Sequence, residues 1–326
     1  MTIQSHDIKQ AVQLLQAGRL VAFPTETVYG LGADATNDRA VAAIYEAKER
    51  PDFNPLIAHV ATVNAARALG RFNTDARKLA DAFWPGALTL VVPRAERCPV
   101  SLLVSAGMSN LALRVPEHPL AHELITRTGR PIAAPSANRS GRISPTTPEH
   151  VLASLDGRID MVLDGGVCGI GLESTIVSCL EDTPVLLRPG GITREAIEDA
   201  LDMRLARPRG KDGAPVAPGQ LASHYAPEAA LRMNATWFEE AEAVLAFGPD
   251  VPVHSGMILN LSESGSLNET AANLFAMLHE LDACGAESIA VMPIPPTGVG
   301  LAINDRLKRA STGRRDIRDN GELRPV

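Results

Sequence analysis

The sequence lacks most features that mark secreted, membrane-bound or metal-dependent proteins. Its 326 residues include only four cysteines, and none of them forms a CxxC pair, so neither a disulfide framework nor a zinc site is indicated. No apolar run approaches the length of a membrane span, and no basic segment followed by an apolar core opens the chain. We therefore expect reduced thiols, no membrane insertion and a cytoplasmic location.

Aromatic residues and positive charge are also scarce. Only 4% of the residues are aromatic, and the formal net charge is −7. RNA-binding modules usually combine basic surfaces with aromatic rings that stack on bases, so stable direct nucleic-acid binding is not expected. The hydrophobic content of 45% is ample for a packed core, and the length of the chain favours two domains.

The common catalytic signatures are missing as well. The sequence contains no GxxxxGK[ST] phosphate loop, no HExxH metal site, no GxSxG elbow and no GxGxxG placed after a strand. These absences give no support to standard P-loop, metalloprotease or hydrolase chemistry. The function has to come from polar side chains at the ends of strands and helices.

Residues 1–205 are predicted to form one domain. Helices are expected to begin near Ser5, after Asn37, and near residues 74, 147 and 193, and strands are expected at 19–23, 88–92, 110–115, 131–134, 161–163, 174–179 and 185–187. So many strands among so few helices indicate an α+β domain with a twisted mixed sheet and flanking helices.

The chain changes character after this domain. Residues 206–230 are rich in proline, glycine and charge, which predicts a linker. In residues 231–326, apolar strands at 244–247, 257–261 and 288–294 alternate with helices, as is typical of a small Rossmann-like α/β domain with a parallel sheet. The basic tail at 305–326 is interpreted as a solvated helix end rather than an RNA contact.

Two polar segments follow predicted elements in the first domain. Residues 23–32, FPTETVYGLG, leave a strand at Pro24, which cannot donate to a strand ladder, and such a place suits a small-molecule site. Lys48 and Arg50 end a predicted helix near Asn54, which lies between two prolines. They either complement the helix dipole or hold a triphosphate.

Two ionisable residues lie in apolar strands. His59 is explained equally well as a satisfied core residue and as a ligand. Arg114 requires a carboxylate partner, which is either a glutamate of the protein or a carboxylate of the substrate. Glu26 either orients its neighbours or caps a turn. The segments 134–141, 164–177 and 187–191 lie at further strand ends, where their glycines favour turns or a close approach of the backbone to an anion.

These motifs together resemble the YrdC-type threonylcarbamoyl-AMP synthases. The resemblance rests on FPTETVYGLG, the KxRP of residues 48–51, NPL at 54–56, SxN at 136–138, STIV at 174–177 and LRPG at 187–190. The APG of residues 217–219 and the SHYAP of residues 223–227 make the chain similar to the two-domain form of that family. The resemblance therefore covers nearly the whole chain.

The resemblance implies an activity. Members of this family make L-threonylcarbamoyladenylate from L-threonine, bicarbonate and ATP, with Mg²⁺ on the phosphates and with release of pyrophosphate. The product would serve a downstream threonylcarbamoyl transferase complex that modifies the adenosine beside the anticodon of tRNA. Two alternatives are an RNA-binding module and the carbamoyl-adenylate chemistry of hydrogenase maturation. The chain lacks the acylphosphatase-like and zinc-finger-like segments expected for the second alternative.

The resemblance also implies the roles of individual residues. Lys48 and Arg50 would be the catalytic cations. L-Threonine would be held by Thr27, His59, Arg114 and Ser174, with Arg114 on its carboxylate. ATP would be surrounded by Lys48, Arg50, Asn54, Asn110, Ser136, Asn138, Ser144, Arg188 and, from the linker, Tyr225. The sequence indicates neither the metal ligands, nor the oligomeric state, nor whether the second domain acts as a lid or as a docking surface.

Overall fold

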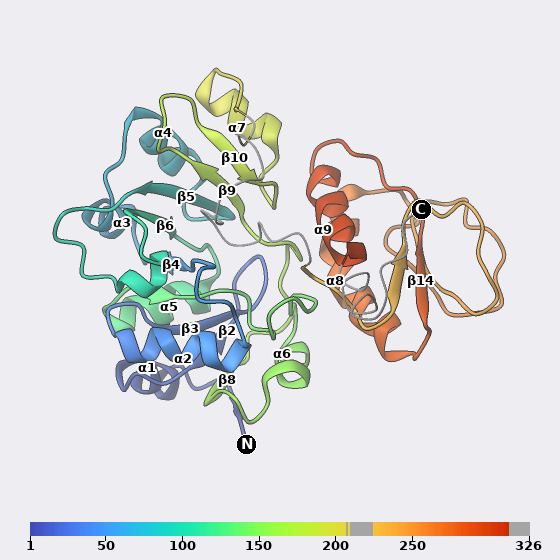
Figure 1. The fold of residues 1–326 in the computed structure, drawn as a ribbon, viewed down its shortest axis with the longest axis horizontal. Coiled ribbons are helices and arrows are strands. Elements are labelled where there is room, and N and C mark those ends of the chain that lie inside the picture. The colour runs from blue at the N-terminus through green and yellow to red at the C-terminus, as the bar shows by residue number, and fades with distance from the viewer. Residues whose placement is uncertain (207, 209–223, 313–326) are drawn as a thin grey trace, which may run out of the picture. The chain divides into compact units, whose positions relative to one another are not determined.

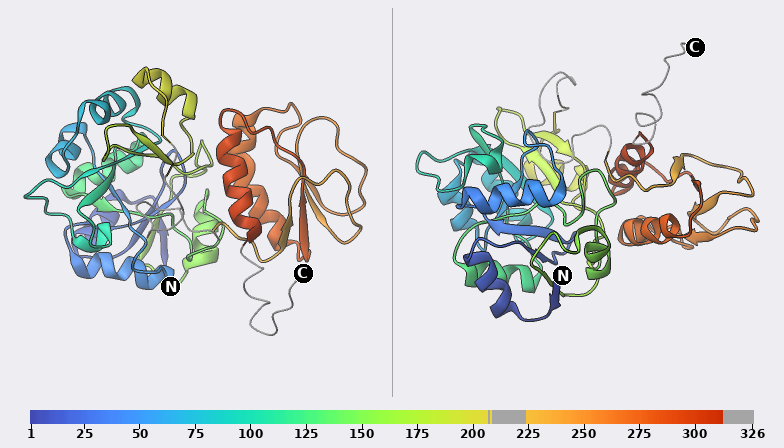
Figure 2. Two further views of the ribbon diagram at one scale, coloured as in Figure 1. Left: turned by 45° about the horizontal axis from the view of Figure 1, so that its top comes forward. Right: turned by 60° about the horizontal axis from the view of Figure 1, so that its bottom comes forward.

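The computed structural model describes residues 1–206, 208 and 224–312. The chain divides into two compact units, one of residues 1–139 with 144–220 and one of residues 140–143 with 221–326 (Figures 1 and 2). Most of the predicted linker lies outside the described residues, so the proposed boundaries at 205 and 231 stay a prediction.

The first unit is built on one mixed sheet of ten strands, which confirms the predicted fold class. Neighbouring strands are parallel in some pairs, such as β4 with β6, and antiparallel in others, such as β2 with β3. In spatial order the strands are β1 (Ile3–Ser5), β8 (Met161–Leu163), β2 (Val21–Phe23), β3 (Gly30–Asp34), β7 (Ile132–Ala133), β4 (Ile57–His59), β6 (Asn110–Arg114), β5 (Leu88–Pro93), β9 (Thr175–Ser178) and β10 (Val185–Arg188).

Local sequence signals start most of the helices. Asn37 and Thr147 accept hydrogen bonds from the first turns of α2 and α6, as the sequence predicts. The first helix begins at Ile8 with Asp7 as its cap, not at Ser5, because Ser5 belongs to β1. The helices of this unit are α1 (Ile8–Gln16), α2 (Asp38–Lys48), α3 (Val63–Leu69), α4 (Thr74–Phe83), the 3₁₀ turn η1 (Leu102–Ser105), α5 (Pro119–Thr128), α6 (Pro148–Leu155) and α7 (Arg194–Leu201).

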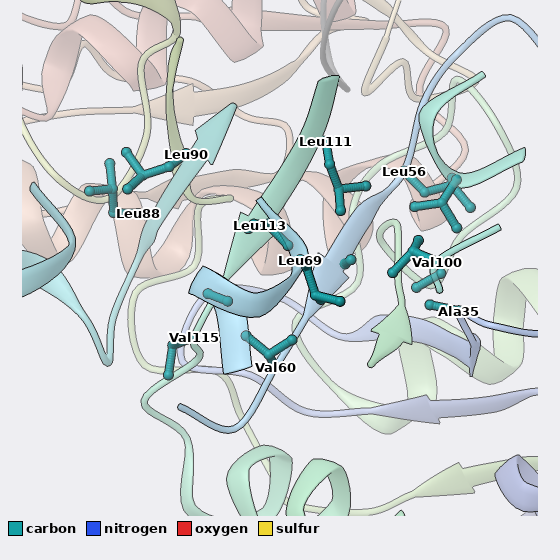
Figure 3. Packing of buried hydrophobic residues seen from close by; sticks show 14 of the residues in the cluster. Ala35, Leu56, Val60, Leu69, Leu88, Leu90, Val100, Leu111, Leu113 and Val115 are labelled. Carbon is teal, nitrogen blue, oxygen red and sulfur yellow. The ribbon is translucent and has the colours of Figure 1, made fainter. Parts of the chain in front are cut away.

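Helices cover the two faces of the sheet unequally. The large core lies on one face, where Leu88, Leu90, Leu111 and Leu113 of the strands (Figure 3) belong to one cluster with residues of the helices α2, α3, α4, α6 and α7. On the other face, α1 and α5 pack over β8, β2 and β7 around a second cluster that includes Phe23. The strands β4, β6, β5 and β9 carry only a small apolar cluster on that second face. This thinly covered half of the sheet positions the site described below.

The second unit contains a separate parallel sheet, as predicted. Its strands lie in the order β11 (Ala230–Arg232), β14 (Ser288–Val291), β12 (Ala243–Ala246) and β13 (Ile258–Asn260). Helices α8 (Leu267–Ala283) and α9 (Gly300–Thr312) belong to the same unit. Among the described residues of both units, no helix is long and apolar enough to cross a membrane.

Candidate active site

Strand alternation places polar side chains on the thinly covered face of the sheet. Along each strand every second residue shares a face. Ala112 belongs to the small apolar cluster, so Asn110 and Arg114 of β6 share its face. By the same alternation, His59 of β4 lies on the face of Ile57, and it pairs in register with Arg114. The predicted residues His59, Asn110 and Arg114 therefore share one face of two neighbouring strands.

Arg114 is held by the segment that follows β2. Its Nη1 donates to Thr27 Oγ1 at 3.0 Å, its Nη2 donates to Glu26 Oε1 at 2.5 Å, and its Nε donates to the carbonyl oxygen of Gly86 at 3.2 Å. The other carboxylate oxygen of Glu26 accepts the backbone N–H of Glu117 at 3.2 Å. Burial opposes ionisation of Glu26, but the charge and hydrogen bond of Arg114 outweigh it and lower its pKa.

These contacts identify a protein partner of Arg114 and show what Glu26 binds. Glu26 orients its neighbours, and it is the protein carboxylate that partners Arg114. A guanidinium group has five N–H donors, of which three are used in these contacts. Arg114 thus keeps donors for a further carboxylate.

His59 is a buried, neutral ring beside this pair. Its side chain is 3% exposed, and Nδ1 lies 3.2 Å from the carbonyl oxygen of Ile57. Burial, helped by the charge of Arg114, lowers its pKa to about 3. The ring of Phe23 meets it edge to face at 6.2 Å. His59 can therefore offer a neutral donor or acceptor, but not a charge, near neutral pH.

A second group of predicted residues gathers around the start of β9. Ser174 Oγ lies 2.8 Å from Thr89 Oγ1, and Arg188 donates to the Ser174 carbonyl oxygen at 2.8 Å and to its Oγ at 3.2 Å. Ser144 donates to Glu173 Oε1 at 2.5 Å, so the residue before Ser174 is tied as well.

Gly190 explains the glycine of the LRPG motif at this place. A Cβ at residue 190 would lie 2.3 Å from the backbone oxygen of Glu173 and 2.5 Å from the backbone nitrogen of Thr175. Real Cβ atoms do not approach backbone this closely, so only glycine fits. The motif thereby lets two backbone segments cross beside Arg188.

The two predicted catalytic cations bind backbone carbonyl oxygens. Lys48 Nζ donates to the Ser136 carbonyl oxygen at 2.7 Å and also to the Asn138 carbonyl oxygen. Arg50 donates to the carbonyl oxygens of Asn54 and Pro55 at 3.1 and 2.8 Å. Lys48 is buried, and burial, followed by the charge of Arg50, lowers its pKa well below the ordinary value. The KxRP segment is thus fastened to the NPL loop and to the SxN loop.

Asn54 carries the most informative signal in this region. Its side chain is 0% exposed, and neither Oδ1 nor Nδ2 has a hydrogen-bond partner. A buried polar group without a partner costs about 1–3 kcal/mol, so native structures rarely keep one without a reason. An unpaired amide in the loop that Arg50 holds indicates a place where a polar ligand completes the structure.

Known proteins match the chain along nearly its whole length. The Sua5/YciO/YrdC family model, described as telomere recombination, matches residues 13–190, and the model of the threonylcarbamoyl-AMP synthase C-terminal domain matches residues 192–312. The threonylcarbamoyl-AMP synthase of Bacillus subtilis is 44% identical, covering 94% of this chain and 93% of that protein. The chain belongs to the threonylcarbamoyl-AMP synthase family.

Relatives with solved structures support the same assignment. The threonylcarbamoyl-AMP synthase of Pyrococcus abyssi is 39% identical over 95% of each chain. The crystal structure of P. abyssi Sua5 complexed with L-threonine matches this fold with a TM-score of 0.86, covering 96% of this chain and 98% of that one. As a member of the threonylcarbamoyl-AMP synthase family, this protein is an enzyme of the nucleotidyltransferase type.

Tyr225 and Asn110 contact residues that are not among the predicted site residues. Tyr225 belongs to the second unit, where its ring stacks on Phe275 at 5.6 Å and lies 5.2 Å from the guanidinium of Arg306. Asn110 opens β6, and its Nδ2 lies 3.9 Å from the sulfur of Met108. The roles that the family resemblance implies for these residues stay predictions.

Sequence reasoning missed two residues of the site. Thr89 is a polar residue inside the apolar strand β5, and this interruption can be read in the sequence. The structure shows that Thr89 is fully buried. Glu173 lies in the GLEST segment, but its partner Ser144 is far away in the chain. Among the described residues no group of three or more His, Cys, Asp or Glu side chains could hold a metal ion.

Proposed function

We propose that the protein makes L-threonylcarbamoyladenylate from L-threonine, bicarbonate and ATP and releases pyrophosphate. The observation that carries this proposal is the buried, unpaired Asn54 amide, in the loop whose carbonyl oxygens accept hydrogen bonds from Arg50. The Arg114–Glu26 pair lies in the same unit of the chain. The product would be used by a transferase complex that modifies tRNA beside the anticodon. Family membership favours this function over the RNA-binding and hydrogenase-maturation alternatives.

The threonine would lie between β6 and the start of β9. The spare N–H donors of Arg114 suit its carboxylate, and the hydroxyl groups of Thr27 and Ser174 suit its polar side chain. The neutral ring of His59 would accept or donate one hydrogen bond without adding charge. The crystal structure of the P. abyssi relative with L-threonine supports an amino acid site in this fold.

The chemistry would proceed by positioning rather than by a catalytic dyad. The threonine amine either adds to carbon dioxide and loses a proton, or condenses with bicarbonate and releases water, to give a carbamate. A carbamate oxygen then attacks the α-phosphorus of ATP. The bond from the α-phosphorus to the bridging oxygen breaks, and pyrophosphate leaves with the negative charge. Lys48 and Arg50 would neutralise this charge, and correct alignment alone supplies effective concentrations of about 10⁵ M or more.

Mg²⁺ fits this scheme as an ion carried by the substrate. Magnesium usually keeps several waters and binds substrate phosphates with few protein ligands. Near the proposed phosphate position the chain supplies the carbonyl-bound cations Lys48 and Arg50, together with the amide of Asn54. When bound, the ion would neutralise phosphate charge; the chain's own residues would hold and orient the nucleotide.

The test is pyrophosphate release by the purified protein with ATP and Mg²⁺, omitting threonine and bicarbonate one at a time. We expect release to require both compounds. Lys48→Ala and Arg50→Ala should abolish release and leave the fold intact by circular dichroism, and Arg77→Ala, on the exposed side of α4, is the matched control. Near-normal turnover in both variants, or release without threonine, would contradict the proposal.

A further inference from the structure

The end of α2 and the loop after β7 are joined by two contacts on consecutive residues. Lys48 donates to the carbonyl oxygens of Ser136 and Asn138, and Arg139 Nη2 donates to Glu49 Oε2 at 2.6 Å. The pair of residues 48 and 49 thus faces the pair 138 and 139, with the direction of donation reversed. The half-exposed pair of Glu49 and Arg139 joins the same two segments that the buried ammonium group of Lys48 joins.

Glu49 adopts an unusual backbone conformation for this contact. It ends α2 in the left-handed region, with φ 53° and ψ 41°. Glycine or asparagine usually occupies such a helix end, because a Cβ is strained there. Glycine at this position would keep the backbone conformation and would lose only the contacts of the Glu49 carboxylate.

The Glu49 carboxylate joins three segments. Oε1 accepts from Arg158 Nη1 at 2.8 Å, in the segment that follows α6, while Oε2 accepts from Arg139. The backbone N–H of Arg139 in turn donates to Ser154 Oγ of α6 at 2.9 Å. The hydrogen bond from Arg139 is the largest influence that lowers the pKa of Glu49, so the carboxylate is charged near neutral pH.

We propose that Glu49 is a positioning residue that, through Arg139, fixes the carbonyl oxygens of residues 136 and 138 and thereby the Lys48 ammonium at the phosphate position. This inference rests on the proposed function, because only there does Lys48 contact ATP. The ion pairs are about half exposed, so they contribute little to global stability. Their effect is on geometry, where a displacement of about 1 Å can cost a hundredfold in rate.

The test compares variants at the two oxygens of the same carboxylate. Glu49→Gln and Arg139→Gln should each lower kcat/KM for ATP by about tenfold or more, with the KM for threonine unchanged. Arg158→Gln is the matched control, since it removes the contact that does not lead to the loop of residues 136–139, and its loss should be smaller. The double variant of Glu49 and Arg139 should be no worse than either single variant, because both remove one interaction.

Glu49→Gly separates positioning from stability. Glycine relieves the left-handed strain, so the melting temperature should not fall, while kcat/KM for ATP should fall as in Glu49→Gln. The inference is wrong if activity and melting temperature fall together, if Arg158→Gln is as harmful as Glu49→Gln, or if the effects of Glu49→Gln and Arg139→Gln simply add. If the unsubstituted protein shows no threonine-dependent pyrophosphate release, the proposed function is wrong, and this inference is wrong as well because it rests on that function. An active wild type with a fully active Glu49→Gln variant refutes the inference alone.

Discussion

Replacing Asn54 by leucine should make the protein more stable and less able to use ATP. The Asn54 amide is completely buried, and both its oxygen and its nitrogen are unpaired. Leucine has a similar branched shape and needs no hydrogen bond. If the amide serves to bind a ligand, its removal should stabilise the folded protein in the absence of that ligand.

The size of the gain follows from the two unpaired groups. Each costs about 1–3 kcal/mol when buried without a partner. The larger volume of leucine returns about 1 kcal/mol or more through overpacking. We therefore expect the free energy of unfolding to rise by about 1–5 kcal/mol. Each kcal/mol corresponds to about 2–4 °C in Tm in a unit of this size.

The assay is urea and thermal unfolding with and without MgATP, together with the KM for ATP. At about 100 times its Kd, ATP should stabilise the wild type by about 2.7 kcal/mol and should give the variant little. Asn73→Leu is the control, because Asn73 caps α4 by accepting the Ala76 N–H at 2.8 Å and also donates to the Cys179 carbonyl oxygen. That variant should lose about 1 kcal/mol. The reasoning is refuted if Asn54→Leu is destabilised as much as the control, since its amide would then be satisfied in the free protein.

Two further predictions concern pH and the crossing of the backbone. The folded-state pKa of His59 lies near 3 against an ordinary value of 6.5, so the unfolded chain binds more protons between these values and stability falls as pH decreases through them, by up to about 1.4 kcal/mol per pH unit. Urea unfolding from pH 7 to 4 should show this slope, and it should be flatter in His59→Gln; equal slopes would mean that His59 is accessible to protons. Gly190→Ala should destabilise by about 2 kcal/mol or more, because its Cβ meets the backbone of Glu173, whereas Gly169→Ala, with open space around it, should be nearly neutral in the same melts.

Elements with strong local signals could be predicted from the sequence, and short edge strands could not. The caps Asn37 and Thr147 and the apolar strands of the first unit lie where the pattern places them. The strands β1 and β11 have mostly exposed or half-buried residues, so they carry no hydrophobic alternation to read. The helix α5, which is not among the predicted helices, does carry local signals, with Pro119 at its start and Gly129 in the left-handed region at its end.

The residues of the candidate site could be predicted from the sequence one by one, but the contacts between them could not. That Arg114 needs a carboxylate follows from its apolar strand, yet the choice of Glu26 depends on a contact across 88 positions of the chain. Every residue has a backbone carbonyl group, so the sequence does not show which of these groups accept hydrogen bonds from side chains. The contacts of Lys48 with the carbonyl oxygens of Ser136 and Asn138 could therefore only be found in the structure.

The different partners of the cations would suit the two kinds of substrate in the proposed function. Arg114 is balanced by Glu26, so the pair is close to neutral and matches an amino acid that carries one charge of each sign. Lys48 instead meets carbonyl oxygens, which hold its ammonium without cancelling its charge, and burial beside Arg50 leaves its pKa depressed. A phosphate group that approaches Lys48 would relieve this unfavourable charge without breaking an ion pair. In the proposed function, an acidic protein with net charge −7 would in this way keep a local site for a polyanion, because its loops hold Lys48 and Arg50 by carbonyl oxygens and not by carboxylates.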